Sequence, residues 1–272
     1  MLYIIYKPPT SLIQYFQLCW PDILWLVPTT STSSSSSATI DGNTTSRNKL
    51  IALTIDDGPS PYTAEILQTL KANDATATFF LIGSNITDLI TDTGADTGKK
   101  RAAESQAETL HGLLLAGNEI ANHAMHDESS WRLSDAELVA QIKAVERKIQ
   151  LIYNSAYTTT TTTPTTLTTS TKYPREDTRR PPKYFRPGSG FFTTRMRRLL
   201  AALDYKLVLG SVYPHDAQIP FPRLNAWHIL SLARPGGIII CHDGRRWTPP
   251  MLRVVLPELR KRGYRVVTVT EL

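Results

Sequence analysis

The chain of 272 residues has few cysteines and no long apolar run, and these absences exclude several classes of protein. Its two cysteines, Cys19 and Cys241, are too few for a disulfide framework. They therefore do not indicate whether the protein works in an oxidising or a reducing compartment. The apolar stretches at 1–6 and 23–27 end at prolines, far short of the roughly 20 residues of a membrane-spanning helix. No basic segment precedes a clean apolar core, so we expect neither a membrane span nor a signal peptide.

The net charge of +6 does not indicate a nucleic-acid partner. Much of it lies at 175–183 and near the C-terminus, where aromatic residues do not alternate with the basic ones as they do in single-strand grooves. We interpret this charge as a solvated basic face, with a bias toward anionic cell-wall polymers as the alternative. The hydrophobic content of 41% is sufficient for the core of one large α/β domain or of two small ones.

Apolar runs typical of strands alternate with amphipathic stretches typical of helices, which predicts βαβ units and a parallel sheet. Ser134 and Glu137 form a capping box at the start of one such helix. Strands are expected at 50–53, 75–82, 206–209, 237–241 and 264–269, and helices at 63–73, up to 115, 134–153, 193–203, 226–233 and 251–262.

Low-complexity segments divide the chain. The Ser/Thr-rich stretch before residue 49 cannot build a core, so we expect an N-terminal extension and linker at 1–48 and a single domain at 49–272. Polar insertions are expected near 88–106 and 154–180, the second nearly all threonine over part of its length. Within the extension, residues 21–24 could add an edge element to the sheet.

Two adjacent carboxylates, Asp56 and Asp57, follow the first strand and precede Gly58 and Pro59. Neighbouring strand residues point to opposite sides, so each carboxylate could face a different partner, one a cation and the other a proton. That division of tasks suits metal-assisted hydrolysis. The alternative is a turn in which one aspartate caps the next helix.

Three further groups could join this pair. His123 is followed by His126 and Asp127, spacings that place side chains on one face of a helical turn and suit a divalent ion such as zinc. Arg186 precedes a glycine-containing loop whose backbone N–H groups could hold an oxyanion. His242 ends an apolar run and must point into the core or into a site. Each could instead be structural, but Asp56, Asp57, His242 and Asp243 all follow apolar runs, and barrel enzymes gather their active sites at that edge.

With these residues the sequence resembles the polysaccharide deacetylase family, carbohydrate esterase family four, over about residues 50–272. The first motif is the most specific match. The family's motifs are matched in order by Thr54–Ser60, Asn122–Asp127, Arg186–Gly190, Ser211–Asp216 and Ile240–Gly244.

The second motif departs from the family pattern, in which the second histidine follows the first by four residues. Here that position holds Asp127, and residues 132–134 lie where the family commonly shows Arg-Leu-Ser. The resemblance therefore implies Asp57, His123 and Asp127 as metal ligands, with His126 as the alternative third ligand. Zinc is the expected ion, with cobalt or manganese as alternatives for this harder set of donors.

The resemblance also implies a fold and a reaction. The fold is an α/β, distorted (β/α) barrel of about seven parallel strands, and the reaction is hydrolysis of N-acetyl groups from an amino-sugar polysaccharide. Asp56 would be the general base, oriented by Arg186, which Asp216 would position in turn. His242 would be the general acid, with Asp243 or another acid supporting its charge. The backbone near Ser189 and Gly188 would stabilise the oxyanion.

The implied partner is an N-acetylated polysaccharide or oligosaccharide, and the implied location is extracellular or at the cell wall. Ser189 replaces the aromatic residue of the third motif and the fourth motif lacks its tryptophan, so the sugar groove has thinner aromatic walls. The alternatives are a degenerate member that binds glycan without hydrolysing it, and a deacetylase of a smaller amide or ester.

Overall fold

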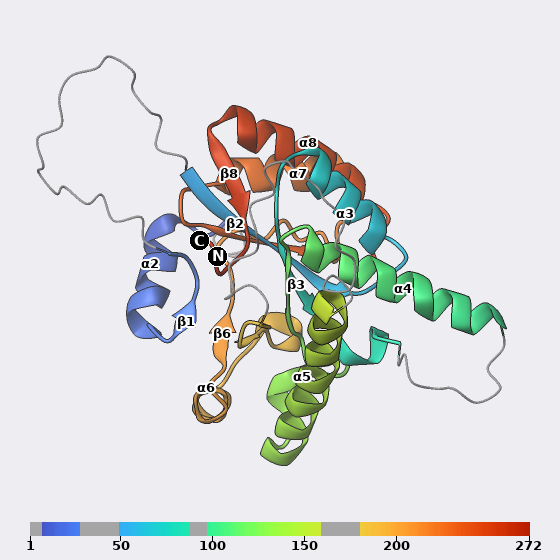
Figure 1. The fold of residues 1–272 in the computed structure, drawn as a ribbon. Coiled ribbons are helices and arrows are strands. Elements are labelled where there is room, and N and C mark those ends of the chain that lie inside the picture. Colours follow the sequence, from blue (N-terminus) through green and yellow to red (C-terminus); the bar gives the residue numbers. More distant parts are fainter. Residues whose placement is uncertain (1–6, 28–48, 88–96, 159–179) are drawn as a thin grey trace, which may run out of the picture.

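The computed structural model describes residues 7–27, 49–87, 97–158 and 180–272, and these form strands surrounded by helices (Figure 1). The strands are β1 (Ile23–Leu24), β2 (Lys49–Gly58), β3 (Thr78–Leu81), β4 (Glu119–Asn122), β5 (Tyr184–Phe185), β6 (Lys206–Val208), β7 (Ile238–His242) and β8 (Tyr264–Val267). The helices are α2 (Thr10–Cys19), α3 (Thr63–Ala72), α4 (Thr97–Leu115), α5 (Asp135–Thr158), α6 (Thr194–Ala202), α7 (Pro222–Leu232) and α8 (Thr248–Lys261), with 3-10 turns η1 (Gly83–Asn85), η2 (Ser130–Arg132) and η5 (Gly188–Gly190).

The strands form one parallel sheet in the order β1-β6-β5-β4-β3-β2-β7, with β8 also paired to β2. Single bridges bring the two edges of this sheet together: Leu26, just after β1, pairs with Gly237, and Val212 pairs with Ile239 of β7. The sheet therefore curls round on itself but closes through isolated bridges rather than a full ladder. The predicted distorted (β/α) barrel in a single domain is confirmed.

The N-terminal segment supplies the edge strand of the barrel. Ile23 of β1 pairs with Leu207 of β6 and is fully buried. The rings of Trp20 and Trp25 pack edge-on against Phe192, which follows η5. The expected edge element at residues 21–24 is therefore present, although the preceding helix α2 has no counterpart in the sequence analysis.

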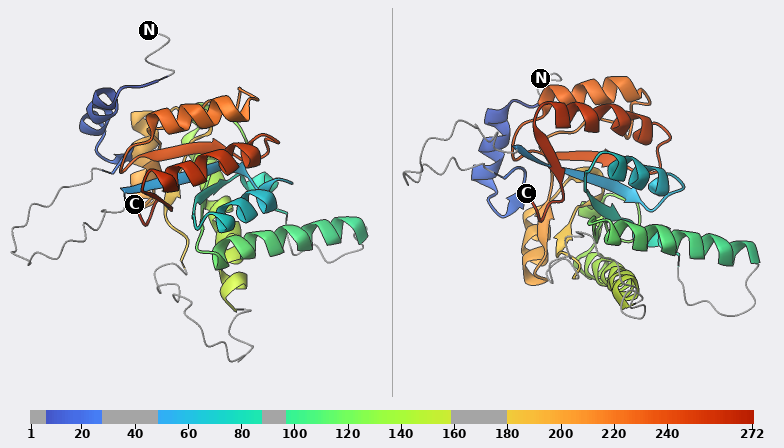
Figure 2. Two further views of the ribbon diagram at one scale, coloured as in Figure 1. Left: turned by 90° about the horizontal axis from the view of Figure 1, so that it is seen from above. Right: turned by 45° about the horizontal axis from the view of Figure 1, so that its top comes forward.

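The helices form a ring outside the strands. Neighbouring helices pack on each other in the order α7, α8, α3, α4, α5 and α6 (Figure 1). Helix α2 lies beside the β1 edge, on the opposite side of the molecule from the protruding end of α4 (Figure 2). Within the described residues, no helix combines the length and the apolar character that crossing a bilayer requires.

A small apolar cluster fills the inside of the barrel. Because successive strand residues point to opposite faces, Phe80 points inward while Phe79 and Leu81 pack outward against the helices. Strand β2 is buried on both faces over most of its length, as expected for a central parallel strand. The inner cluster consists of Ala52, Phe80, Ala121, Val208, Ile238 and Val269.

Several helix boundaries differ from the predicted ones. The capping box is confirmed, since Glu137 N–H donates to Ser134 Oγ (3.3 Å) and Ser134 N–H donates to Glu137 Oε2 (3.0 Å). Helix α5 then runs five residues beyond 153, because Ala156 still packs on the core. Helices α7 and α8 begin earlier than predicted, each with proline in its first turn. Strand β4 was not predicted, because its four residues include glutamate and asparagine.

The predicted polar insertions lie largely outside the described residues. Positions 88–96 and 159–179 are not described, whereas 97–106 and 154–158 belong to α4 and α5. Cys19 is exposed and Cys241 is buried, the latter as expected for a small side chain within an apolar strand.

Replacement of Ile23 tests the role of the N-terminal strand. Ile23→Ala should lower the free energy of unfolding by about 2–5 kcal/mol, because it leaves a cavity between β1 and its neighbours. Leu18→Ala, in the same segment but at a side chain that is 80% exposed, should change it by less than about 0.5 kcal/mol. Urea unfolding of both variants provides the measurement. Equal effects would mean that the segment does not contribute to the barrel core.

Candidate active site

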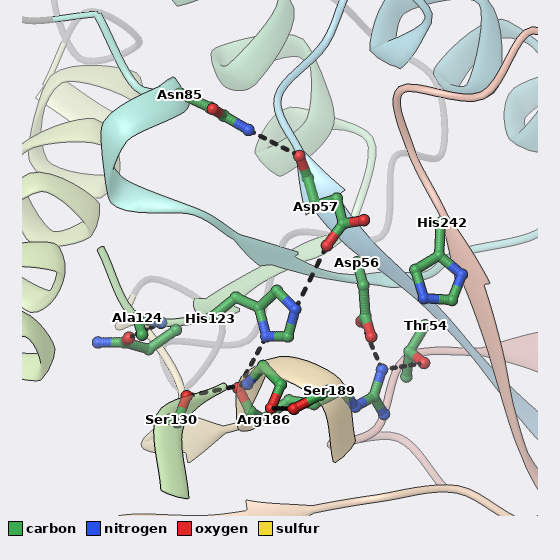
Figure 3. A network of polar contacts seen from close by, with 12 residues as sticks. Thr54, Asp56, Asp57, Asn85, His123, Ala124, Ser130, Arg186, Ser189 and His242 are labelled. Atoms are coloured by element: carbon green, nitrogen blue, oxygen red, sulfur yellow. Dashed lines mark hydrogen bonds and ion pairs between the residues drawn. The ribbon is translucent and has the colours of Figure 1, made fainter. Parts of the chain in front are cut away.

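The carboxyl ends of β2, β4, β5 and β7 bring the predicted polar residues to one edge of the barrel. Asp56 of β2 is the register partner of His242 of β7. His123 follows β4 directly, and Arg186 follows β5. Figure 3 shows these four side chains around Asp57. Residues separated by up to 186 positions thus gather because parallel strands end at the same edge of the sheet.

Asp56 and Arg186 form a buried ion pair. Arg186 Nη1 lies 2.6 Å from Asp56 Oδ1, and the two residues are 2% and 3% exposed. The same nitrogen donates to Thr54 Oγ1 (2.6 Å), while Nε and Nη2 donate to the carbonyl oxygens of Val208 and Leu209 (3.1 and 3.3 Å). The guanidinium carbon lies 4.2 Å from the centroid of the Phe80 ring, on top of the inner cluster. Arg186 is therefore fixed on all sides and compensates the charge of Asp56.

Asp57 lies on a β-bulge. The register of β2 against β3 shifts between Asp56 and Gly58, and Asp57 has a φ of 68°, in the left-handed region. Such a conformation costs a residue with a side chain about 1–3 kcal/mol and is found mainly at functional sites. Asn85 Nδ2 donates to the Asp57 carbonyl oxygen at 2.9 Å. The bulge, rather than simple alternation, therefore determines where the two carboxylates point.

Asp57 faces His123. His123 Nε2 lies 3.4 Å from Asp57 Oδ1, and Nδ1 lies 2.7 Å from the Arg186 carbonyl oxygen, to which it donates. Burial would lower the pKa of His123, but the hydrogen bond and charge of Asp57 outweigh it and raise that pKa. Burial would likewise raise the pKa of Asp57, but His123, with the charges of His242 and Arg245, lowers it. Each side chain therefore favours the charged form of the other.

The predicted third ligand does not join this pair. Residues 123–129 form an irregular loop in which Ala124 has a φ of 65°, so the helical spacing assumed for His126 and Asp127 does not apply. Both side chains are exposed. Among the described residues, no group of three His, Cys, Asp or Glu side chains is placed to hold an ion.

Asp216 contacts His242 and not Arg186. Asp216 Oδ1 lies 2.8 Å from His242 Nδ1, and Oδ2 accepts from the His242 backbone N–H (2.8 Å). Burial alone would lower the pKa of His242, but the charge of Asp216 outweighs it and raises that pKa to about 9. The expectation that Asp216 positions Arg186 is corrected: the donors of Arg186 bind Asp56, Thr54 and backbone carbonyls.

The hydrogen bonds of Asp243 are structural. Its carboxylate accepts hydrogen bonds from Ser60 Oγ and Thr63 Oγ1, both 2.5 Å, and from the Gly244 N–H at 2.7 Å. It therefore joins the loop after β7 to the start of α3. The acid that supports His242 is Asp216 rather than Asp243.

The loop after Arg186 has one backbone donor left for an oxyanion. The Gly188 N–H donates to Ser130 Oγ (3.0 Å) and the Gly190 N–H donates to the Pro187 carbonyl (3.1 Å). Within this turn, the Ser189 N–H is the backbone donor without an acceptor among the described residues. Ser189 has a φ of 61°. A Cβ on Gly188 would lie 2.0 Å from the carbonyl oxygen of Glu128, so the close approach of these loops requires glycine there.

Other residues of the site were not identified from the sequence. Thr54 and Asn85 hold Arg186 and Asp57 by the hydrogen bonds described above. The Tyr213 ring lies 5.8 Å from that of His242, edge to face, and supplies an aromatic surface within the fourth motif. Arg245 Nη2 lies 3.5 Å from Asp57 Oδ2. The only signals available were the position of Tyr213 within the fourth motif and that of Arg245 directly after the fifth.

Comparisons with known proteins match this chain to polysaccharide deacetylases. A family model described as polysaccharide deacetylase matches residues 43–174. A peptidoglycan-N-acetylglucosamine deacetylase of Bacillus cereus is 30% identical over 230 residues, which cover 82% of this chain and 88% of that protein. A chitin deacetylase of Colletotrichum lindemuthianum is 24% identical over 82% of this chain and 78% of its own. The solved structure of the peptidoglycan deacetylase PdaC from Bacillus subtilis superposes with a TM-score of 0.62 and 27% identity, covering 83% and 90% of the two chains.

The fold is a parallel barrel with polar residues at the carboxyl edge of its strands, the edge at which barrel enzymes gather their active sites. The chain belongs to the polysaccharide deacetylase family. The predicted family is confirmed, and with it the predicted class of enzyme, a hydrolase that removes N-acetyl groups from amino-sugar polymers.

The Asp216–His242 pair predicts a pH dependence. A pKa raised from 6.5 to about 9 means that this pair stabilises the fold fully below pH 6.5 and loses its contribution as the pH rises through about 9. Asp216→Asn should lower the pKa of His242 from about 9, because it removes the main interaction that opposes burial and leaves only the charges of Asp56 and Asp57 to raise that pKa. Titration of the His242 ring by NMR in both proteins provides the measurement, with exposed Asp135→Asn as the control. An unchanged pKa would contradict the role of Asp216.

Proposed function

We propose that this protein is a metal-dependent deacetylase in which Asp56 is the general base and His242 the general acid. The observation that carries the proposal is a pair of ion pairs at one edge of the barrel, one around a carboxylate and one around an imidazole. Arg186 compensates the Asp56 carboxylate, whereas Asp216 keeps His242 protonated. Paired groups held in opposite protonation states are typical of acid–base catalysis at neutral pH.

A divalent cation fits the chemistry of two donors. The Nδ1 of His123 donates to a backbone carbonyl, so Nε2 is the nitrogen available to an ion, and it faces a carboxylate oxygen of Asp57. Metal binding at these two residues would require an ionised carboxylate and an Nε2 free of its proton. We propose Asp57 and His123 as ligands and Asp127 as the third, with His126 as the alternative. Zinc is the proposed ion, with cobalt or manganese as alternatives, and when bound it would polarise the acetyl carbonyl and acidify water.

The side chains of the site then have separate tasks. Asp56 takes the proton of the attacking water while a carbon–oxygen bond forms at the acetyl carbon. Arg186 holds Asp56 in place through their ion pair. The Ser189 N–H donates to the oxyanion as negative charge develops on the carbonyl oxygen. His242 donates its Nε2 proton to the amide nitrogen as the carbon–nitrogen bond breaks, which releases acetate and an amino sugar.

The proposed substrate is an N-acetylated glycan, as the names of the relatives suggest. They include deacetylases of peptidoglycan and of chitin, so the chemistry common to them is an acetamido group on a hexose polymer. Because such polymers lie outside the cell membrane, we propose an extracellular or cell-wall location. The ring of Tyr213 beside His242 offers an apolar surface to one face of the sugar.

Asp56→Asn tests the catalytic assignment. This variant should lower the rate of acetate release from N-acetylglucosamine oligomers by about 10²–10⁴-fold, because the water loses its proton acceptor, while metal affinity is kept. Acetate release should be assayed with added Zn²⁺, Co²⁺ or Mn²⁺, and Asp135→Asn is the control. Full activity of Asp56→Asn would overturn the assignment. No release by the unmodified protein from glycan oligomers or small amides would instead indicate a protein that binds glycan without hydrolysing it.

Two neighbouring variants test the third ligand. Asp127→Ala should lose bound Zn²⁺ and His126→Ala should keep it, and metal analysis after dialysis distinguishes them. Each variant is the control of the other, because both side chains are exposed and neither substitution disturbs the core. The reverse result would assign His126 as the ligand, and retention by both would exclude the two.

A further inference from the structure

Arg245 follows the strand that carries His242 and reaches back to Asp57. Its Nη2 lies 3.5 Å from Asp57 Oδ2, while the other oxygen of Asp57 faces His123 at 3.4 Å. The Asp57 side chain is 14% exposed and that of Arg245 is 30% exposed. Each oxygen of the proposed metal-binding carboxylate is therefore next to a nitrogen of a basic side chain.

The backbone around Arg245 is anchored. Gly244 has a φ of 71°, and its N–H donates to Ser60 Oγ at 3.1 Å. The carbonyl oxygen of Arg245 accepts from the Thr248 N–H (3.0 Å) at the start of α8. The origin of this side chain is thus held by the loop between β2 and α3 and by the start of α8, and its distance from Asp57 is a property of the fold rather than of a free loop.

The carboxylates facing the site each have a cationic partner. Asp56 pairs with Arg186, Asp216 with His242, and Asp57 with Arg245. Two of these cations have catalytic tasks in the proposed function, whereas Arg245 has none. A divalent cation bound to Asp57 would share that carboxylate with the guanidinium, and like charges a few ångströms apart repel each other.

We propose that Arg245 is the counter-ion of the metal centre: it neutralises Asp57 in the metal-free protein and weakens cation binding there. This inference rests on the proposed roles of Asp57 and His123 as ligands. It makes Arg245 a positioning and affinity-setting residue, which acts on the cation through Asp57. Loss of the guanidinium removes both the competing ion pair and the repulsion, so metal affinity rises.

The test measures the dissociation constant for Zn²⁺ by calorimetric titration of the full chain after treatment with a chelator. Arg245→Met keeps the length of the side chain without its charge and should bind Zn²⁺ about tenfold more tightly or better. Arg245→Lys keeps the charge and should stay near the unmodified protein. Arg246→Met, at the neighbouring and exposed arginine, is the matched control and should show no change. The gain should shrink in 1 M salt, where the Debye length is about 3 Å.

The outcomes separate the inference from the function on which it rests. Equal or weaker Zn²⁺ binding by Arg245→Met, with normal binding by the other proteins, overturns the inference alone. No binding by any of the four proteins overturns the proposed metal site and the inference together. A second measurement, the melting temperature, also detects a folding defect. The metal-free Arg245→Met protein should melt at a lower temperature than the unmodified protein, and its melting temperature should rise more on addition of Zn²⁺, since tighter binding stabilises the folded state further. A smaller gain than in the unmodified protein overturns the inference.

Discussion

The buried ion pair between Asp56 and Arg186 connects the central strand β2 to the loop after β5, across the top of the barrel interior. Moving two charges out of water costs several kcal/mol per ion, which good geometry and satisfied donors must offset. Arg186 meets both conditions, because its other contacts are Thr54 and the carbonyls of Val208 and Leu209. A well-packed apolar pair would often be as stable. The presence of charges here is therefore better explained by chemistry than by stability.

Arg186 also links the two halves of the site. Its side chain lies on Phe80, so the packing of the inner cluster sets the height of the guanidinium and hence of Asp56. Its carbonyl oxygen accepts from Nδ1 of His123, which determines the nitrogen that faces Asp57. A single residue thus orients the proposed base through its side chain and the proposed metal ligand through its backbone. A displacement of β5 would disturb both functions at once.

The sequence could predict features that depend on local pattern. The alternation of strands and helices predicts the parallel sheet, the family resemblance adds its closure into a barrel, and polar residues after apolar runs predict the shared edge that holds Asp56 and His242. Features that depend on contacts between distant segments could not be predicted. The bulge at Asp57 requires the pairing of β2 with β3. Whether Asp216 contacts His242 or Arg186 depends on the path of its loop. The edge element at 21–24 was expected, but its pairing with β6 could not be predicted, because the strand around Ile23 has two residues and no periodicity.

The three ion pairs of the site differ in how readily they can exchange partners. The side chain of Arg186 is 3% exposed and that of His242 is 13% exposed, so replacing either cation would require the barrel edge to open. Arg245 is 30% exposed and its guanidinium can turn toward water without disturbing the core. Desolvation makes the first two pairs permanent, whereas solvent access makes the third replaceable. The carboxylate with the replaceable partner is Asp57, which is also the carboxylate that the proposed reaction requires to accept a different cation.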